Sequence, residues 1–258
     1  LDNYYSDKAG QWGANYLVDG TMYYFGNIHI LSGSTENTID YAIIKNGTKG
    51  IQIDNHTDDA TTLTIANTQI QNMSIAGIYA QNANLLVYNT VISKCDYYAV
   101  ALVFGGHYDF VHTTIANYTT ARSSASVVFN NYYTTDETAY VFDFDATFTN
   151  SIIYGALTNE FAADGVASDE IKFDFEFNNC MLKFSSNINN NPSFRNVICS
   201  ADSLPRFVNP AEYDFRLDTL SAAKDRGTNA LLHLYPIDID GIERDSLPDL
   251  GAYERVEK

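Results

Sequence analysis

Apolar and polar residues alternate in short stretches along the first 190 residues, which is the period of a β-strand with one buried face. Many of these stretches lead into one recurring unit, an Asn, a small residue and then an aliphatic residue, as in Asn67-Thr68-Gln69-Ile70. Copies of the unit begin at Asp40, Asn67, Asn89, His112, Asn150 and Asn179. Their spacings of 27, 22, 23, 38 and 29 residues match coils of about 22 residues or more, stacked as a solenoid. The longest protruding loop is expected between His112 and Asn150.

A second set of short apolar strands follows these units, usually after a glycine turn. Its members are Gly50-Ile51-Gln52-Ile53, Gly77-Ile78-Tyr79-Ala80, Ala99-Val100-Ala101-Leu102 and Ser126-Val127-Val128-Phe129. Because the two sets alternate in a fixed order, we expect coils in a parallel stack, each burying its apolar side chains against its neighbours. The sequence therefore predicts an all-β fold, a right-handed parallel β-helix over residues 1–190, with a C-terminal closing segment over residues 191–258.

The recurring Asn has a structural explanation. At a tight turn its amide can bond to backbone groups, and the residue tolerates a left-handed conformation. Asn67, Asn89, Asn150 and Asn179 would then stack from coil to coil, and their amides would satisfy one another. We assign these four residues to an Asn ladder that stabilises the fold, rather than to catalysis.

The pattern changes after about residue 190. The chain there carries Phe207-Val208-Asn209-Pro210, Asp214-Phe215-Arg216-Leu217, Ser221-Ala222-Ala223-Lys224-Asp225-Arg226-Gly227, Asp238-Ile239-Asp240-Gly241, Arg244 and Asp249-Leu250-Gly251-Ala252-Tyr253-Glu254. These segments resemble the C-terminal part of secreted right-handed β-helix proteins of Gram-negative bacteria, a group similar to the pectate-lyase-like proteins. Ala222 departs from the resemblance, because the group usually has Pro there.

The resemblance implies an extracytoplasmic protein, secreted or held on the outer-membrane surface as a lipoprotein. It also implies that N-terminal coils are missing from this chain, because Gln11-Trp12-Gly13 is similar to an element that follows the first coils in the group. Three segments, which begin at Asp202, Asp218 and Asp245, read Asp-Ser/Thr-Leu. They resemble acceptors of protein O-glycosylation in some of these bacteria, which agrees with export.

The charge and hydropathy of the chain exclude some classes of binding partner. The net charge is −17, with 15 Lys and Arg against 32 Asp and Glu. This balance disfavours nucleic acid, because phosphates need clustered basic side chains. No apolar stretch approaches the ~18 residues of a membrane span. The expected partner is therefore a polysaccharide or another extracellular surface molecule.

The first candidate for chemistry comes from aligning the strands that precede the Asn turns. Period-2 alternation points Phe142, Phe144, Ala146 and Phe148 inward and Asp143 and Asp145 outward. The same alignment of neighbouring coils stacks His107, Asp145 and Asp174 in one outward column, Asp109 and Glu176 in the next, and Lys172 opposite Asp143.

Carboxylates on strands about 4.8 Å apart repel, so one pKa rises or a cation binds. Hydrolysis by general acid–base catalysis uses such a pair. We therefore interpret Asp145 and Asp174 as a candidate acid–base pair, with His107, Asp109, Lys172 or Glu176 assisting. The alternative is a solvated acidic face of the sheet.

The second strand set offers a candidate for carbohydrate binding. In the resembled enzymes the substrate groove usually lies over this set, whose outward residues here are Gln52, Tyr79, Ala101 and Val128. Tyr79 could stack against a sugar ring, so Tyr79 and Gln52 form the candidate binding site. We expect no base and no cation on this face, although a lyase needs both. An ordinary surface is the alternative.

A third candidate is a metal site in one loop. Asp54, Asp58 and Asp59 lie close together in the sequence, and oxygen-rich loops bind Ca²⁺. Ca²⁺ is therefore the one cofactor that the sequence suggests. No glycine turn and no distal Glu complete a known calcium motif, so a plain polar loop is the alternative.

Three functions agree with these patterns, because a fold does not determine a function. The first is a non-catalytic surface protein that binds glycan or another extracellular partner. The second is a polysaccharide-degrading enzyme, either a lyase or a glycoside hydrolase. The third is a structural segment of a larger surface protein. We expect the first, because the sequence contains no recognisable catalytic set.

Overall fold

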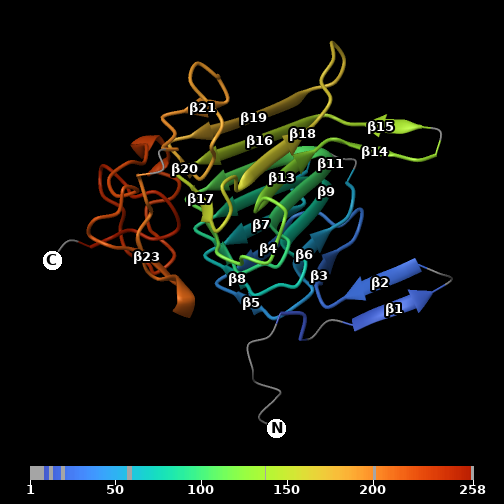
Figure 1. Ribbon diagram of the computed structural model, residues 1–258, viewed down its shortest axis with the longest axis horizontal. Coiled ribbons are helices and arrows are strands. Elements are labelled where there is room, and N and C mark those ends of the chain that lie inside the picture. The colour runs from blue at the N-terminus through green and yellow to red at the C-terminus, as the bar shows by residue number, and fades with distance from the viewer. Residues whose placement is uncertain are drawn as a thin grey trace, which may run out of the picture.

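The computed structural model describes residues 9–11, 14–18, 21–56, 60–136, 138–199 and 202–256. It is nearly all-β, with 3% of residues in helices, and its parallel sheets stack as a β-solenoid of about six turns (Figure 1). The predicted parallel β-helix is therefore confirmed. No helix in the described part of the chain is long and apolar enough to cross a bilayer.

Each full coil contributes strands to three faces of the solenoid. Face 1 consists of β3 (Ile28–Ile30), β6 (Lys49–Ile53), the first halves of β9 (Ala76–Tyr88) and β11 (Tyr98–Val111), β13 (Val127–Asn130) and β18 (Phe161–Asp164). Face 2 consists of β4 (Asn37–Asp40), β7 (Leu63–Ala66), the second halves of β9 and β11, β16 (Phe144–Thr149), β19 (Phe173–Asn178) and β21 (Phe194–Arg195). Face 3 consists of β5 (Ile43–Lys45), β8 (Gln69–Gln71), β10 (Val91–Ser93), β12 (Thr114–Asn117), β17 (Ile152–Gly155) and β20 (Met181–Leu182).

Rows of apolar side chains fill the interior, one residue from each coil in a row. Phe110, Phe148 and Phe177 are fully buried and occupy the same register position on face 2. The Phe110 and Phe148 rings stack 4.4 Å apart at an angle of 4°, and the Phe148 and Phe177 rings lie 5.2 Å apart. Such ring pairs add about 0.5–1.5 kcal/mol to the burial of their area. The predicted alternation therefore holds within β16, where Phe144, Ala146 and Phe148 are buried.

The turn between faces 2 and 3 has a left-handed backbone in every coil. The residues with positive φ at this turn are Tyr41, Asn67, Asn89, His112, Asn150, Asn179 and Asn196, with values of 45–52°. Asn tolerates this conformation better than other non-glycine residues. Asn89 Nδ2 donates to Asn67 Oδ1 over 3.2 Å, and Asn196 Nδ2 donates to Asn179 Oδ1 over 3.4 Å. Backbone geometry thus places the recurring Asn. Of the four residues assigned to the ladder, Asn67 and Asn89 bond to each other, while Asn150 bonds to His112 and Asn179 bonds to Asn196.

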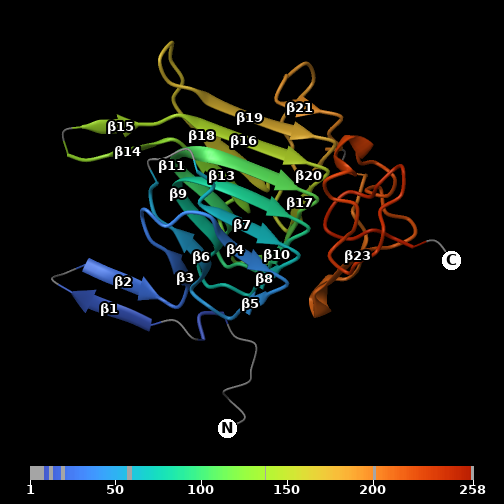
Figure 2. The same cartoon turned by 180° about the vertical axis from the view of Figure 1, so that it is seen from behind.

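The C-terminal segment lies along the side of the solenoid rather than across its end (Figure 2). It contains the antiparallel pair β22 (Phe207–Asn209) and β23 (Asp214–Leu217). Its apolar side chains pack against outward residues of face 3, such as Ile152 and Met181. The segment therefore covers face 3.

Two hairpins project from one side of the solenoid (Figure 1). The first pairs β1 (Ala14–Val18) with β2 (Thr21–Phe25). The second pairs β14 (Tyr132–Thr134) with β15 (Ala139–Val141) and connects face 1 to face 2. The second hairpin lies in the long interval between His112 and Asn150, where the sequence predicted the largest loop.

Candidate functional site

Face 2 carries the predicted column of polar residues. The parallel register of β11, β16 and β19 aligns His107 with Asp145 and Asp145 with Asp174. The same register aligns Asp109 with Thr147 and Thr147 with Glu176. The structure therefore brings the candidate acid–base residues onto one outward surface, in the order that the sequence alignment gave.

His107 is the centre of the contacts in this column. Its Nε2 lies 3.5 Å from Asp109 Oδ2, and its Nδ1 lies 3.5 Å from Asp145 Oδ1. The hydrogen bond to Asp109 and the charges of Asp109 and Asp145 raise the pKa of His107, while partial burial opposes them. All three side chains are about half exposed. The two carboxylates therefore favour the charged form of the imidazole, on a surface that is open to solvent.

Other polar residues of face 2 also contact one another, and Asp143 lies beside Lys172 as expected. Asp143 Oδ1 accepts a hydrogen bond of 2.8 Å from the backbone N–H of Lys172. The ion pair of this surface joins Glu176 to Arg195, with Oε1 and Nε 3.2 Å apart. Arg195 was not predicted from the sequence, because β21 has two residues and follows a loop that hides the coil repeat.

Face 1 carries a second polar cluster, here called the face 1 site. The register of β3, β6 and β9 places His29, Gln52 and Tyr79 in one outward column. His29 Nε2 lies 2.9 Å from Asp54 Oδ1. Gln52 Nε2 donates to Asp54 Oδ1 over 3.3 Å, and Lys49 Nζ donates to Gln52 Oε1 over 2.7 Å. Five side chains from three successive coils therefore form one connected surface.

The Tyr79 ring faces a cation in this cluster. Lys49 Nζ lies 4.5 Å from the ring centroid, so one side of the ring has a partner. Burial lowers the pKa of Lys49, while the charge of Asp54 opposes that effect. Burial also raises the pKa of Tyr79. The ring is held in place by the ammonium group, and it does not offer two free sides for stacking.

The expectation that face 1 has no base and no cation is therefore wrong. His29, Lys49 and Asp54 lie beside Gln52 and Tyr79 on this face. The signal in the sequence is weak, because the second strand set is regular only from Gly50 onward and β3 belongs to an earlier coil. Alternation within Ile28–Ile30 points His29 outward, as the register of β3 with β6 confirms.

The candidate calcium loop lies partly outside the described residues, which exclude Asp58 and Asp59. Asp54 is described, and it contacts His29 and Gln52. Across the described ranges, no group of three or more His, Cys, Asp or Glu is arranged to hold a metal ion. Asp54 is therefore assigned to the face 1 site.

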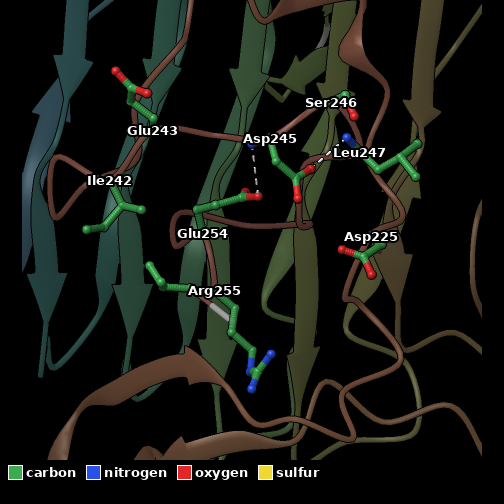
Figure 3. A pocket seen from close by; sticks show the side chains of 9 residues that line it. Asp225, Ile242, Glu243, Asp245, Ser246, Leu247, Glu254 and Arg255 are labelled. Carbon is green, nitrogen blue, oxygen red and sulfur yellow. Dashed lines mark hydrogen bonds between the residues drawn. The ribbon is translucent and has the colours of Figure 1, made fainter. Parts of the chain in front are cut away.

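One pocket lies away from both clusters, within the C-terminal segment (Figure 3). It has a volume of about 470 Å³ and is lined by Asp225, Ile242, Glu243, Asp245, Ser246, Leu247, Glu254, Arg255 and Val256. Burial raises the pKa of Glu254 to about 7. Glu254 also accepts hydrogen bonds from the backbone N–H groups of Asp245 and Asp249, over 3.4 and 3.0 Å. These contacts join the loops of the segment to one another.

Comparison with known proteins adds no relative to the description of this chain. No protein-family model matches the chain, and no curated protein matches its sequence. The chain is a parallel β-solenoid of about six turns with a C-terminal segment packed on its third face.

Proposed function

We propose that this protein is an exported, non-catalytic β-solenoid that binds a glycan through the face 1 site. The observation that carries the proposal is the connected network of His29, Lys49, Gln52 and Asp54 beside the Tyr79 ring. Sugar hydroxyl groups both donate and accept hydrogen bonds, and this network presents amide, ammonium, imidazole and carboxylate groups within a few ångströms. The ring adds an apolar surface at the same place.

The solenoid supports the proposal by holding these groups rigidly. His29, Gln52 and Tyr79 lie on neighbouring strands, about 4.8 Å apart, and each strand is bonded to the next. Polar groups that are already ordered lose little conformational entropy when a ligand binds. A flat row of this kind suits an extended chain that runs from coil to coil. The acidic composition and the terminal motifs agree with a location outside the cytoplasm.

Affinity electrophoresis tests the proposal. The protein is run in native gels that contain neutral or acidic soluble polysaccharides, and retardation measures binding. Gln52→Ala removes the residue that joins Lys49 to Asp54, so we expect it to abolish most of the retardation. Gln71→Ala is the matched control, because Gln71 is a half-buried strand residue on face 3. Equal retardation of the two variants, or none for the unaltered protein, would exclude the face 1 site.

A hydrolase is the second candidate, favoured by the register of face 2. Asp145 and Asp174 occupy paired positions on adjacent strands, and strands lie about 4.8 Å apart. Retaining glycosidases place their two carboxyl groups about 5–5.5 Å apart. If this surface is catalytic, new reducing ends appear with the unaltered protein and disappear in Asp145→Asn and Asp174→Asn. Asp96→Asn, at an exposed turn, is the control. Release of reducing ends that survives both substitutions would exclude the pair.

A further inference from the structure

The hairpin of β14 and β15 carries a stack of aromatic rings on one of its faces. The antiparallel register places Tyr133 directly opposite Tyr140. Their rings lie 4.9 Å apart at an angle of 18°. The Tyr133 ring also stacks on Phe142, 6.0 Å away at 23°, and Phe104 of the preceding coil contacts its edge at 5.2 Å. Phe142, which alternation predicted to point into the core, instead belongs to this stack because β16 begins only at Phe144.

The stack remains open to solvent. Tyr133 is 37% exposed and Tyr140 is 43% exposed. Within the described ranges, Tyr140 has one ring partner, Tyr133, and the exposed part of its ring can contact another flat group. Exposed aromatic side chains that gather in one place mark interaction sites more often than single exposed residues do.

The base of the hairpin is fixed by buried hydrogen bonds. Asn131 is fully buried, and its Nδ2 donates to the carbonyl groups of Phe142 and Val166 over 2.8 and 2.9 Å. Its Oδ1 accepts from the backbone N–H of Val166 over 2.9 Å. On the other face of the hairpin, Tyr132 Oη donates to Asp164 Oδ2 over 2.8 Å. The ring stack is therefore held in one orientation before any ligand arrives, which reduces the entropic cost of binding.

The charged groups around the stack are mostly acidic. Asp136 lies in the hairpin, Asp143 follows it, and Asp164 is bonded to its base, while Lys172 lies beside Asp143. The whole chain has a net charge of −17. A polyanion would be repelled here, at a range of about 8–10 Å at ordinary ionic strength. An uncharged ligand meets no such barrier.

The geometry points to the hairpin as a second glycan-binding surface, on which Tyr140 stacks against a sugar ring of an uncharged polysaccharide. The C–H groups of a pyranose ring are slightly positive, and the face of an aromatic ring is slightly negative. This inference rests on the proposed glycan-binding function and narrows its ligand to neutral chains. It also separates the hairpin from the face 1 site, which uses hydrogen bonds rather than stacking.

The test uses native gels that contain dextran, laminarin, galactomannan or xylan, with polygalacturonate as the acidic comparison. We expect at least one neutral polymer to retard the protein. Tyr140→Ala is expected to weaken that binding about tenfold, and Tyr140→Trp is expected to preserve it because the stacking surface remains. Tyr97→Ala is the matched control: Tyr97 is 52% exposed, and its ring lies 6.4 Å from that of Tyr98 rather than in the hairpin.

Three results would overturn the inference. The first is binding to polygalacturonate alone, and the second is binding to a neutral polymer that Tyr140→Ala leaves unchanged. The third is self-association of the unaltered protein on sedimentation that Tyr140→Ala abolishes, which would make the hairpin an interface between copies. The two sites are distinguishable in the same gels. Sensitivity to Gln52→Ala without sensitivity to Tyr140→Ala would keep the face 1 site and remove the hairpin, and the opposite pattern would do the reverse.

Discussion

His112 holds the turn position that Asn occupies in neighbouring coils. Its side chain is fully buried, and its Nε2 lies 3.1 Å from Asn150 Nδ2. In the described structure its Nδ1 has no hydrogen-bond partner. Burial and the nearby charge of Arg244 hold the pKa of His112 well below its ordinary value. The folded protein therefore keeps this imidazole neutral.

His112→Asn should reduce the loss of stability in mild acid. Below the ordinary pKa of about 6.5, the unfolded chain binds a proton at His112 that the folded protein does not bind. The contribution of His112 is therefore complete above about pH 6.5 and falls as the pH decreases. We expect the variant to lose roughly 1 kcal/mol less than the unaltered protein between pH 7.5 and 5.5. Urea unfolding at the two pH values measures the difference, and equal losses would contradict the assignment.

Arg122 and Glu160 form an ion pair with no exposure to solvent. Arg122 Nη2 lies 2.5 and 2.6 Å from the two carboxylate oxygens of Glu160. Ser126 Oγ also donates to this carboxylate over 2.6 Å. The pair ties the loop after β12 to the loop after β17.

Glu160→Gln should destabilise the protein by about 3–5 kcal/mol, because it leaves the Arg122 charge buried without a counter-charge. Chemical unfolding at neutral pH provides the measurement. Glu170→Gln, at an exposed position, is expected to change the free energy of unfolding by less than about 0.5 kcal/mol. Similar behaviour of the two variants would mean that the Arg122–Glu160 pair is not buried in solution.

At the scale of the strands, alternation and repeat spacing predicted most of the structure. The units at Asn67, Asn89, Asn150 and Asn179 all fall at the same turn, because a left-handed residue is required there once per coil. The pattern failed where an element is short or irregular. β3 and β21 have three and two residues, which is too few for alternation to stand out. As a result, His29 and Arg195 were missed.

Gly77 shows how closely successive coils approach. A Cβ at this position would lie 2.6 Å from the carbonyl oxygen of Ala99 and 2.5 Å from Ile92 Cγ2. Gly77→Ala should therefore cost about 1–3 kcal/mol by overpacking. The reverse change at the equivalent position of the next coil, Ala99→Gly, should cost about 1 kcal/mol or less. Thermal unfolding compares them, and a stable Gly77→Ala variant would show that the coils are less tightly apposed.

At the scale of the whole molecule, the C-terminal segment is clamped to the turn between faces 2 and 3. Arg244 is buried, and its Nη2 donates to Asn89 Oδ1 over 3.0 Å. Its Nη1 lies 3.2 Å from Glu254 Oε2. Asn150 exchanges two hydrogen bonds with the backbone of Thr228, over 2.8 and 2.9 Å. Asn89 and Asn150 of the turn therefore bind the C-terminal segment as well as neighbouring coils. The coil repeat in the sequence does not predict these contacts with the segment.

Arg244→Met should loosen this clamp, because Glu254 and its neighbouring carboxylates would lose their cation. Limited proteolysis is expected to cut within residues 202–256 faster than in the unaltered protein, while the coils stay resistant. Arg226→Met replaces an exposed Arg of the same segment and should leave the cutting rate unchanged. If the coils and the segment become sensitive together, the segment is part of one cooperative unit.

The candidate site was less predictable than the fold, because it depends on side chains from different coils. Gln52 and Tyr79 of the face 1 site were predicted from the sequence. The strand register places His29 in the same site, and side-chain contacts place Lys49 and Asp54 there. Spacing could not reveal that Lys49 covers the Tyr79 ring. The face 2 column was predicted correctly as a geometric row, since strict pairing of β11, β16 and β19 decides it.

Hydroxyl-radical footprinting with a polysaccharide that retards the protein is the sharpest test of glycan binding at the face 1 site. We expect bound glycan to slow oxidation of His29 and Tyr79 on face 1, while His107 on face 2 is oxidised at its free rate. Protection of His107 with unchanged oxidation of His29 and Tyr79 would exclude the face 1 site and would move the binding surface to face 2.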